Sequence, residues 1–302
     1  MPLWIPIAVT AALFQCWRTA MQQKLRSLLS VNGAGFVRYL YGGPAALAFL
    51  LVALAATRVG LPAIAPRMVL YAAAGGFSQI LATNLLIMAF GFRNFAVGTA
   101  YAKTETAQSG VLALVVLHEV LRPIAWIGIA VGLVGVLTLS FVGRGLRARE
   151  LAAATVQPAA LAGLGAGFCF AVTIVFIKLA SQATIGPSVF VRAMFVLLVT
   201  TVLQTAMQGT YLALRDPAEL RKAVAHWRSA SWVGLLSAAG SACWFTGFTI
   251  ADVALVRAVG QIEVVFTLLF SRFYLKERLR RGDVAGLLLV VFGVLLIVLG
   301  SA

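Results

Sequence analysis

Ten apolar stretches of about 20 residues follow one another along the sequence, and they limit the possible folds more than any other feature. They cover residues 3–21, 33–54, 68–90, 95–117, 123–142, 156–179, 187–207, 231–249, 252–270 and 283–300. A helix needs about 20 mostly apolar residues to cross the hydrocarbon core of a bilayer. Hydrophobic residues make up 62% of the 302 positions and charged residues 11%, a composition that soluble domains do not have. The sequence therefore predicts an all-α integral membrane protein with ten transmembrane helices.

Most basic residues lie in the short segments after the first, third, fifth, seventh and ninth stretches. Because cytoplasmic loops of membrane proteins are enriched in Lys and Arg, we expect these segments to lie in the cytoplasm. Ten crossings then place both termini on the outer, periplasmic side of a bacterial inner membrane. The same segments hold most of the excess positive charge, so the net charge of +15 does not indicate binding to nucleic acid.

The chain contains an internal repeat. The segment that starts at His118 aligns without a gap with the segment that starts at Lys276, at a spacing of 158 residues. The identical pairs in this alignment include Glu119 and Glu277, Leu121 and Leu279, Gly128 and Gly286, and Gly135 and Gly293. Earlier in the chain, Phe36-Val37-Arg38 matches Phe190-Val191-Arg192 at a spacing of 154 residues. These two anchors predict that the chain arose by duplication.

The duplication predicts a first five-helix repeat over residues 1–142, a cytoplasmic linker over 143–155 and a second five-helix repeat over 156–302. Because each repeat has an odd number of helices, the second repeat enters the membrane in the opposite orientation. Inverted repeats of this kind are typical of secondary transporters, which bind substrate near mid-membrane between the repeats. We therefore expect two inverted repeats around a central cavity.

One connecting segment predicts an amphipathic helix on the membrane surface, at about residues 216–229. Asp216 is a favourable N-cap, Pro217 suits the first helical position, and Glu219 is the third residue of a capping box. One face then carries Leu220, Val224 and Trp227, and the opposite face carries Arg221, Lys222 and Arg228. This pattern is typical of helices that lie in the membrane interface, although a solvated loop helix has the same pattern.

The two hairpins of the repeat, VVLHEVLRPIAWIGIAVGLVGVLTL and SRFYLKERLRRGDVAGLLLVVFGVLL, resemble those of the drug/metabolite transporter superfamily, specifically its ten-helix EamA-type members. The shared pattern is E-x-L-x(6)-G-x(6)-G-V, which both hairpins contain. The resemblance implies transport without ATP through a cavity between two inverted five-helix halves. It does not specify the substrate, because similar proteins export amino acids, carry nucleotide sugars or other metabolites, or take up small solutes.

Other chemistries lack the residues that they need. Cys16, Cys169 and Cys243 lie apart from one another and from His118 and His226, so neither a metal site nor a disulfide framework is indicated. A cluster of nucleophile and base, typical of a membrane-embedded enzyme, is not found. The G-x-x-x-x-G-K-[ST] loop of ATP-driven pumps is also not found. We expect no cofactor, no metal and no enzymatic activity, and neither an enzyme nor an assembly subunit explains the charges described next.

Charged residues inside the apolar stretches are the candidate functional groups, because a charge at mid-membrane costs roughly 2.5–3.5 kcal/mol and needs a reason. Glu105 corresponds to Glu263 in the repeat, and Arg38 corresponds to Arg192. Residues kept in both halves suggest coupling or gating, with purely structural ion pairs as the alternative. The candidate pairs are Glu105 with Arg38 or Arg18, and Glu263 with Arg192 or Arg257.

Polar residues that differ between the halves are the candidates for substrate recognition, because a substrate is asymmetric. Lys103 corresponds to Gln261, and about 200° of helical rotation separates Lys103 from Glu105, so these two neighbours do not form one ion pair. The predicted substrate-binding residues are Trp17, Arg18, Gln79, Asn84, Tyr101, Lys103, Trp244, Arg257 and Gln261. For the two tryptophans, packing or interface anchoring is the alternative role.

Cations, carboxylates and indole rings together suit a zwitterion such as an amino acid, aromatic ones included. The expected function is therefore a secondary transporter that exports amino acids by alternating access. Carriers of another small metabolite or of a lipid-linked sugar are the alternatives within transport. The expected partners are the small-molecule substrate, membrane lipid and, through the buried carboxylates, protons. We expect a monomer or a weak dimer.

Overall fold

The computed structural model describes residues 2–89, 101–141, 157–186, 188–274 and 281–301. These residues are all-helical, with 87% helix and no strand among them. The predicted linker over 143–155 and residues 95–100 of the fourth predicted span lie outside the described residues. The all-α prediction is confirmed.

The helices follow the predicted spans closely, and three of the spans divide into shorter elements. In chain order they are α1 (Trp4–Leu25), α2 (Val31–Leu40), α3 (Gly42–Thr57), α4 (Pro66–Ala89), α6 (Glu105–Leu112), η1 (Ala113–Leu117), α7 (Pro123–Phe141), α9 (Pro158–Ala183), α10 (Val189–Arg215), α11 (Pro217–Ala225), α12 (Trp227–Ile250), α13 (Val253–Val259), η3 (Gly260–Ile262), α14 (Glu263–Tyr274) and α15 (Arg281–Gly300). Five described segments are long and apolar enough to cross a membrane, namely Val31–Thr57, α4, α9, α10 and α12. Shorter apolar helices cover Glu105–Leu117, Pro123–Leu139 and Val284–Gly300.

Local sequence signals set the helix starts. Proline is the first residue of α4, α7, α9 and α11, where its fixed φ fits the helix and its missing N–H is not needed. Ser30 caps α2 by accepting a hydrogen bond from the N–H of Gly33 at 3.2 Å. Ser188 caps α10 in the same way through the N–H of Val191 at 3.4 Å. These four prolines and two serines therefore fix where six helices begin.

The chain forms two compact units. Unit 1 contains residues 1–80 and 173–251, and unit 2 contains residues 81–172 and 252–302. Each unit combines helices from the first half of the chain with helices from the second half. Neither unit therefore coincides with one of the two predicted repeats. The division of the chain into two repeats stays a prediction from the sequence.

In unit 1, α10 runs antiparallel along α2 and α3. The amide of Gln208 donates to the carbonyl of Asn32 at 3.0 Å, and further along a Cβ on Gly42 would lie 3.8 Å from the methyl group of Thr201. Helix α12 packs against α1 and α3. At its C-terminus, Nζ of Lys178 donates to the carbonyl of Ala251 at 2.8 Å, which satisfies a carbonyl that the helix leaves open.

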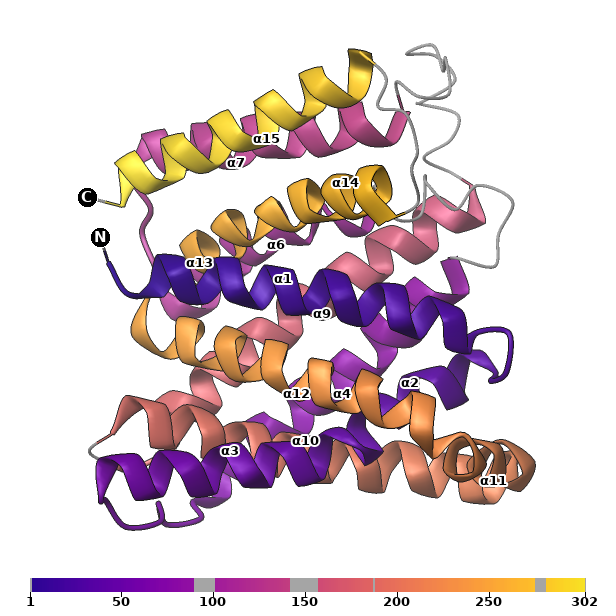
Figure 1. Cartoon of the computed structure of the whole chain (residues 1–302). Helices are drawn as coiled ribbons and strands as arrows, with labels where there is room; N and C mark the ends of the chain where they lie inside the picture. The colour runs from indigo at the N-terminus through magenta and orange to yellow at the C-terminus, as the bar shows by residue number, and fades with distance from the viewer. Residues whose placement is uncertain (1, 90–100, 142–156, 187, 275–280, 302) are drawn as a thin grey trace. The chain divides into compact units, whose positions relative to one another are not determined.

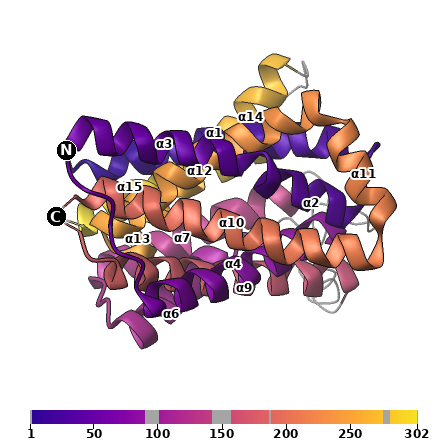
Figure 2. The same cartoon turned by 90° about the horizontal axis from the view of Figure 1, so that it is seen from below.

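The surface helix α11 lies at the end of α10, where it contacts α2 (Figures 1 and 2). It ends at Ala225, so it is shorter than the expected range of 216–229, and Trp227 already begins α12. The predicted N-cap is confirmed, since the carboxylate of Asp216 accepts from the N–H of Glu219 at 3.2 Å. Its position on the membrane surface stays a prediction.

The second half of the predicted capping box differs from the expectation. The N–H of Asp216 donates to the carbonyl of Leu212, and the carboxylate of Glu219 reaches α2 instead. There it accepts from the N–H of Ser30 at 2.8 Å, while Lys222 donates to its other oxygen at 2.8 Å. Partial burial would raise the pKa of Glu219, but these hydrogen bonds outweigh burial and hold the pKa below its ordinary value. Glu219 therefore fastens α11 to the start of α2.

Replacement of Glu219 by glutamine is expected to cost unit 1 about 1 kcal/mol at neutral pH, because an amide loses the charge in both contacts. A lowered folded-state pKa gives stability above the ordinary carboxyl range, and this stability is lost as the pH falls through the folded-state pKa. The difference between the wild-type and variant melting temperatures in detergent should therefore shrink between pH 6 and pH 3. Arg221→Gln, at an exposed neighbour on α11, is the control. A deficit of the same size at both pH values would contradict the role given to Glu219.

In unit 2, α7 and α15 lie side by side and antiparallel (Figure 1). Their backbones meet at glycines, since a Cβ on Gly128 would lie 2.8 Å from the carbonyl oxygen of Gly293, and a Cβ on Gly135 would lie 2.9 Å from that of Gly286. The repeat makes Gly128 equivalent to Gly286 and Gly135 equivalent to Gly293. The two contacts are therefore the same contact made twice, as a two-fold relation between α7 and α15 requires.

The helix boundaries recur at a spacing of 158 residues, the spacing of the alignment between the segments that start at His118 and Lys276. Helices α2 and α10 begin at 31 and 189, α6 and α14 at 105 and 263, and α7 and α15 at 123 and 281, which is 158 residues in each case. The serine caps follow the same spacing. At 158 residues, Arg38 corresponds to Val196 rather than to Arg192, which lies one helical turn earlier. The boundaries thus support the duplication, and they shift the match of Phe36-Val37-Arg38 by one helical turn.

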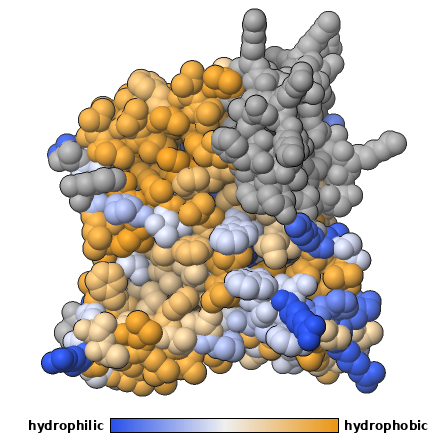
Figure 3. Space-filling view, viewed as in Figure 1, coloured by the Kyte–Doolittle hydropathy of each residue, from blue (hydrophilic) through white to orange (hydrophobic). Residues whose placement is uncertain are grey.

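Large hydrophobic side chains cover much of the surface that Figure 3 shows. Val52, Leu214 and Leu288 are between 64% and 77% exposed, and many other leucine, valine and phenylalanine side chains are also exposed. Soluble monomers rarely expose apolar surface to this extent. Such a surface fits the hydrocarbon of a bilayer.

Candidate functional site

Two helices of unit 2 are interrupted at matching positions. The described part of the predicted span 95–117 opens into a turn at Lys103 and Thr104, and α6 begins at Glu105. In the second half, the 3-10 turn η3 separates α13 from α14, which begins at Glu263. A short 3-10 segment inside a helix often marks a functional hinge. Each glutamate is thus the first residue of a half-helix, where the helix dipole stabilises a carboxylate.

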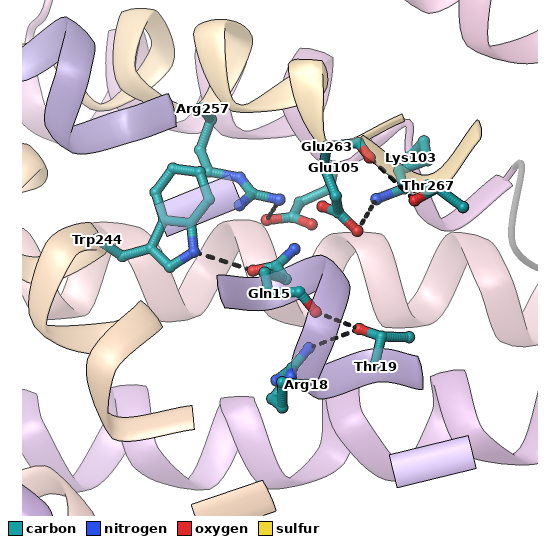
Figure 4. Close-up of polar contacts among 9 residues, drawn as sticks. All are labelled: Gln15, Arg18, Thr19, Lys103, Glu105, Trp244, Arg257, Glu263 and Thr267. Carbon is teal, nitrogen blue, oxygen red and sulfur yellow. Dashed lines mark hydrogen bonds and ion pairs between the residues drawn. The ribbon is translucent and has the colours of Figure 1, made fainter. Parts of the chain in front are cut away.

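Two ion pairs connect these half-helices (Figure 4). Nζ of Lys103 lies 3.0 Å from Oε1 of Glu263, and Nη2 of Arg257 lies 2.8 Å from Oε1 of Glu105. Each pair joins a carboxylate from one half of the chain to a cation from the other half. We call these four residues, together with Gln261, the charged cluster.

This geometry corrects the ion-pair partners that the sequence analysis expected for the two glutamates. Glu105 pairs with Arg257 rather than with Arg38 or Arg18. Glu263 pairs with Lys103, which was not among its expected partners. The separation of Lys103 from Glu105 on the helix is consistent with their different partners.

The two pairs differ in exposure. The side chains of Arg257 and Glu105 are 9% and 10% exposed, whereas those of Lys103 and Glu263 are 22% and 11% exposed. The guanidinium of Arg257 is planar and contacts Glu105 through Nη2, while a lysine is a point charge on a flexible stem. The Arg257–Glu105 pair is therefore the more rigid one, and the Lys103–Glu263 pair is the more accessible one.

Gln261 is buried and belongs to η3. In the sequence it lies between Arg257 and Glu263. Neither its Nε2 nor its Oε1 has a hydrogen-bond partner among the described residues. The amide packs against Gly132 of α7, where a Cβ would collide with Oε1. A buried amide with unmade hydrogen bonds is costly, and such groups in native structures call for an explanation.

Neighbouring residues hold the interruptions in place. Oε2 of Glu119, the glutamate of the first hairpin motif, accepts from the N–H of Val253 at 2.8 Å and so caps α13. A Cβ on Gly167 of α9 would lie 3.0 Å from the carbonyl oxygen of Ala102 and 3.2 Å from the nitrogen of Glu105, so α9 approaches the first interruption closely. Glu119 of the hairpin motif therefore has a structural role, because it positions α13, the helix that carries Arg257.

Unit 1 has a small pocket of its own, with about 10 Å³ of space that a water-sized group can occupy. Nε of Arg38 donates to Oγ of Ser237 at 2.6 Å, and Nε2 of Gln204 donates to Oε1 of Gln79 at 2.7 Å. All four residues line this pocket, together with Tyr39. Of the predicted site residues, Arg38 and Gln79 are thus brought together in unit 1.

The remaining predicted residues of unit 1 lie on several helices. Nε1 of Trp244 donates to Oε1 of Gln15 at 2.9 Å (Figure 4). The ring of Trp244 stacks on that of Phe248, with 5.7 Å between the ring centroids. Arg18 is buried and donates to Oγ1 of Thr19 at 3.3 Å, whereas Trp17 is 51% exposed. This exposure favours the alternative of interface anchoring for Trp17.

Three further predicted residues lie on separate helices or turns. The carbonyl of Tyr101 accepts from Oγ1 of Thr104 at 2.6 Å, which belongs to the turn before α6. Asn84 lies in the last turns of α4 in unit 2. Arg192 lies in the first turn of α10, and its buried Nε has no hydrogen-bond partner among the described residues.

Sequence reasoning missed several polar residues. Gln204, Ser237 and Gln15 each complete a hydrogen bond to a predicted residue. Their signal was a polar side chain within an apolar stretch, the same signal that identified Gln79. No group of three or more His, Cys, Asp or Glu residues that could hold a metal occurs in the part of the chain that the structure describes.

Apolar spans and a hydrophobic exterior define the class, a multi-pass membrane protein. The model of the EamA-like transporter family matches residues 157–299. This match confirms the resemblance to the drug/metabolite transporter superfamily. The family indicates a membrane transporter of small solutes rather than an enzyme.

A solved structure described only as "Crystal structure of protein" is similar to this chain, with a TM-score of 0.73. The match covers 98% of this chain and 96% of that one at 18% identity. At this identity the similarity concerns the fold alone. A comparison with curated proteins gives no match.

Proposed function

We propose that this protein is a secondary transporter that moves amino acids across a bacterial inner membrane by alternating access. The observation that carries the proposal is the pair of ion pairs at matching helix interruptions in unit 2. Interrupted helices that present charged groups at mid-membrane are how many transporters build substrate sites. Four charges with no net excess suit a solute that carries both charges itself.

The proposed architecture is a ten-helix inverted repeat with both termini on the periplasmic side. It is supported by twin helices that run antiparallel within the units, α7 with α15 in unit 2, and α2 and α3 with α10 in unit 1. The recurrence of helix boundaries at 158 residues supports the same relation. Two copies of one structure in opposite orientations can exchange conformations, which gives inward-open and outward-open states of similar energy.

Uptake of a panel of labelled amino acids into proteoliposomes, with and without a pH gradient, tests the proposal. At least one amino acid should accumulate faster than in protein-free liposomes, and preloading with unlabelled solute should accelerate its entry. Stimulation by the gradient would add proton coupling to the mechanism. If only other metabolites or lipid-linked sugars move, the amino-acid part fails while transport stands. If no solute moves, the transport proposal itself is wrong.

A further inference from the structure

The two ion pairs of the charged cluster differ in a way that separates binding from support. Lys103 is the most exposed of the four charged side chains, and its stem leaves the ammonium free to turn without moving the backbone. Arg257 and Glu105 are more buried, and α13, which carries Arg257, is fixed by Glu119. Opening the first pair therefore requires less rearrangement than opening the second.

We infer that the Lys103–Glu263 pair opens to bind substrate and selects zwitterions, while the Arg257–Glu105 pair stays closed as its support. The inference rests on the proposed transport function and names the substrate class of the same site. Lys103 takes the carboxylate of the solute, and Glu263 takes its ammonium group. The ion pair of the empty protein is replaced by two ion pairs with the solute.

Charge balance gives the reason for this selectivity. The Lys103–Glu263 pair is neutral, and it stays neutral when a zwitterion enters, because each charge keeps one opposite partner. An anion of the same shape would take Lys103 away from Glu263, and a cation would take Glu263 away from Lys103. Removing one partner of a buried pair corresponds to roughly 100-fold or more in an equilibrium constant. The site therefore discriminates against solutes that carry only one of the two charges.

Gln261 supplies a further group of the kind that a zwitterion needs. Its amide has both a donor and an acceptor, both are buried, and both lack a partner among the described residues. It lies two residues before Glu263 and corresponds in the repeat to Lys103. Its donor suits a carboxylate and its acceptor an ammonium group, so its unmade hydrogen bonds fit the same class of solute.

Matched sets of solutes test the selectivity on purified wild-type protein at pH 7. Leucine and phenylalanine are each compared with the acid that lacks the amino group and with the amine that lacks the carboxyl group. Ligand-induced shifts of the melting temperature over a concentration series give the Kd values. We expect at least one zwitterion to bind about 100-fold more tightly than its acid and its amine. Equal binding within a set, or binding of neither zwitterion by a protein that transports another solute, would overturn the inference and leave transport intact.

Three double variants assign the selectivity to the pair. Lys103→Gln with Glu263→Gln removes both charges together, so no buried charge is left alone and the fold should survive. Its preference for the zwitterion should fall to about threefold or less, the level of a neutral amide site. The exchanged variant, Lys103→Glu with Glu263→Lys, keeps the pair neutral and should recover at least tenfold preference.

The control is Glu219→Gln with Lys222→Gln, an ion pair in unit 1 outside the charged cluster. It should keep the wild-type ratio of the three Kd values. A wild-type ratio in the doubly neutral Lys103 and Glu263 variant would show that these residues do not select the substrate. Failure of the exchanged variant to recover preference, in a folded protein, would count against the pairing with both charges of the solute.

Discussion

Replacement of Gly293 by alanine is expected to destabilise unit 2 by about 3 kcal/mol, at the upper end of what overpacking costs. The added Cβ would lie 2.7 Å from the nitrogen of Gly132 and 2.8 Å from the carbonyl oxygen of Gly128. Both neighbours are backbone atoms, so no side chain can turn away, and α7 and α15 must separate. The melting temperature in detergent, followed by circular dichroism, should fall by roughly 5–10 °C.

The repeat supplies a second variant for this prediction. Gly135 is the equivalent of Gly293 in the first half, and its added Cβ would lie 2.7 Å from the nitrogen of Val290. Gly135→Ala should therefore destabilise the protein by a similar amount. Gly43→Ala is the matched control, because Gly43 is also helical and nothing lies within 4 Å of its added Cβ. That variant should be neutral or stabilised by up to about 1 kcal/mol. Equal melting temperatures for Gly293→Ala and Gly43→Ala would refute the close contact.

The sequence predicted the all-helical structure because the information for it is local. Apolar runs marked the helices, Pro217 marked the start of α11, and the recurrence of one hairpin indicated the duplication. The interruption at Gly260 could have been anticipated from a glycine inside an apolar run. The turn at Lys103 and Thr104 could not, since both residues are compatible with a helix and no local signal marks the close approach of α9 at Gly167.

The members of the charged cluster were predicted, and its pairing was not. An intramembrane charge is visible in sequence because it is costly in hydrocarbon, and this identified Lys103, Glu105, Arg257 and Glu263. Which charges meet depends on how α6 lies along α13 and α14, and no local signal encodes that. The repeat relates Glu105 to Glu263, and the structure adds that each takes its cation from the opposite half.

The symmetry of the cluster is incomplete in a way that matters for function. A perfect two-fold relation would pair both glutamates with equivalent cations, but Arg257 and Lys103 occupy positions that are not equivalent in the repeat. Glu263 consequently has the more exposed partner, and Gln261 stands where the first half has Lys103. Shared residues thus build the scaffold, and the differing residues leave one pair accessible to an asymmetric solute.

Glu105→Gln is expected to cost about 3–5 kcal/mol, because it leaves the guanidinium of Arg257 buried without its carboxylate. Removing both charges, in Glu105→Gln with Arg257→Gln, should restore most of this loss, since a neutral amide pair has no charge to solvate. The measurement is a double-mutant cycle, with unfolding in mixed micelles of rising SDS content followed by circular dichroism. The coupling free energy between Glu105 and Arg257 should be about 3 kcal/mol or more.

The Lys103–Glu263 pair gives the comparison within the same cluster. Glu263→Gln should cost less than Glu105→Gln, because the side chain of Lys103 is 22% exposed and its ammonium group can turn toward water. The smaller cost follows from the same difference in exposure that makes this pair the one to open for substrate. Equal costs for the two glutamine variants, or additive effects of Glu105→Gln and Arg257→Gln, would mean that the Arg257–Glu105 pair does not hold the half-helices together. In that case the rigid support on which the Lys103–Glu263 pair depends would have to lie in the helix packing around Gly132 and Gly167.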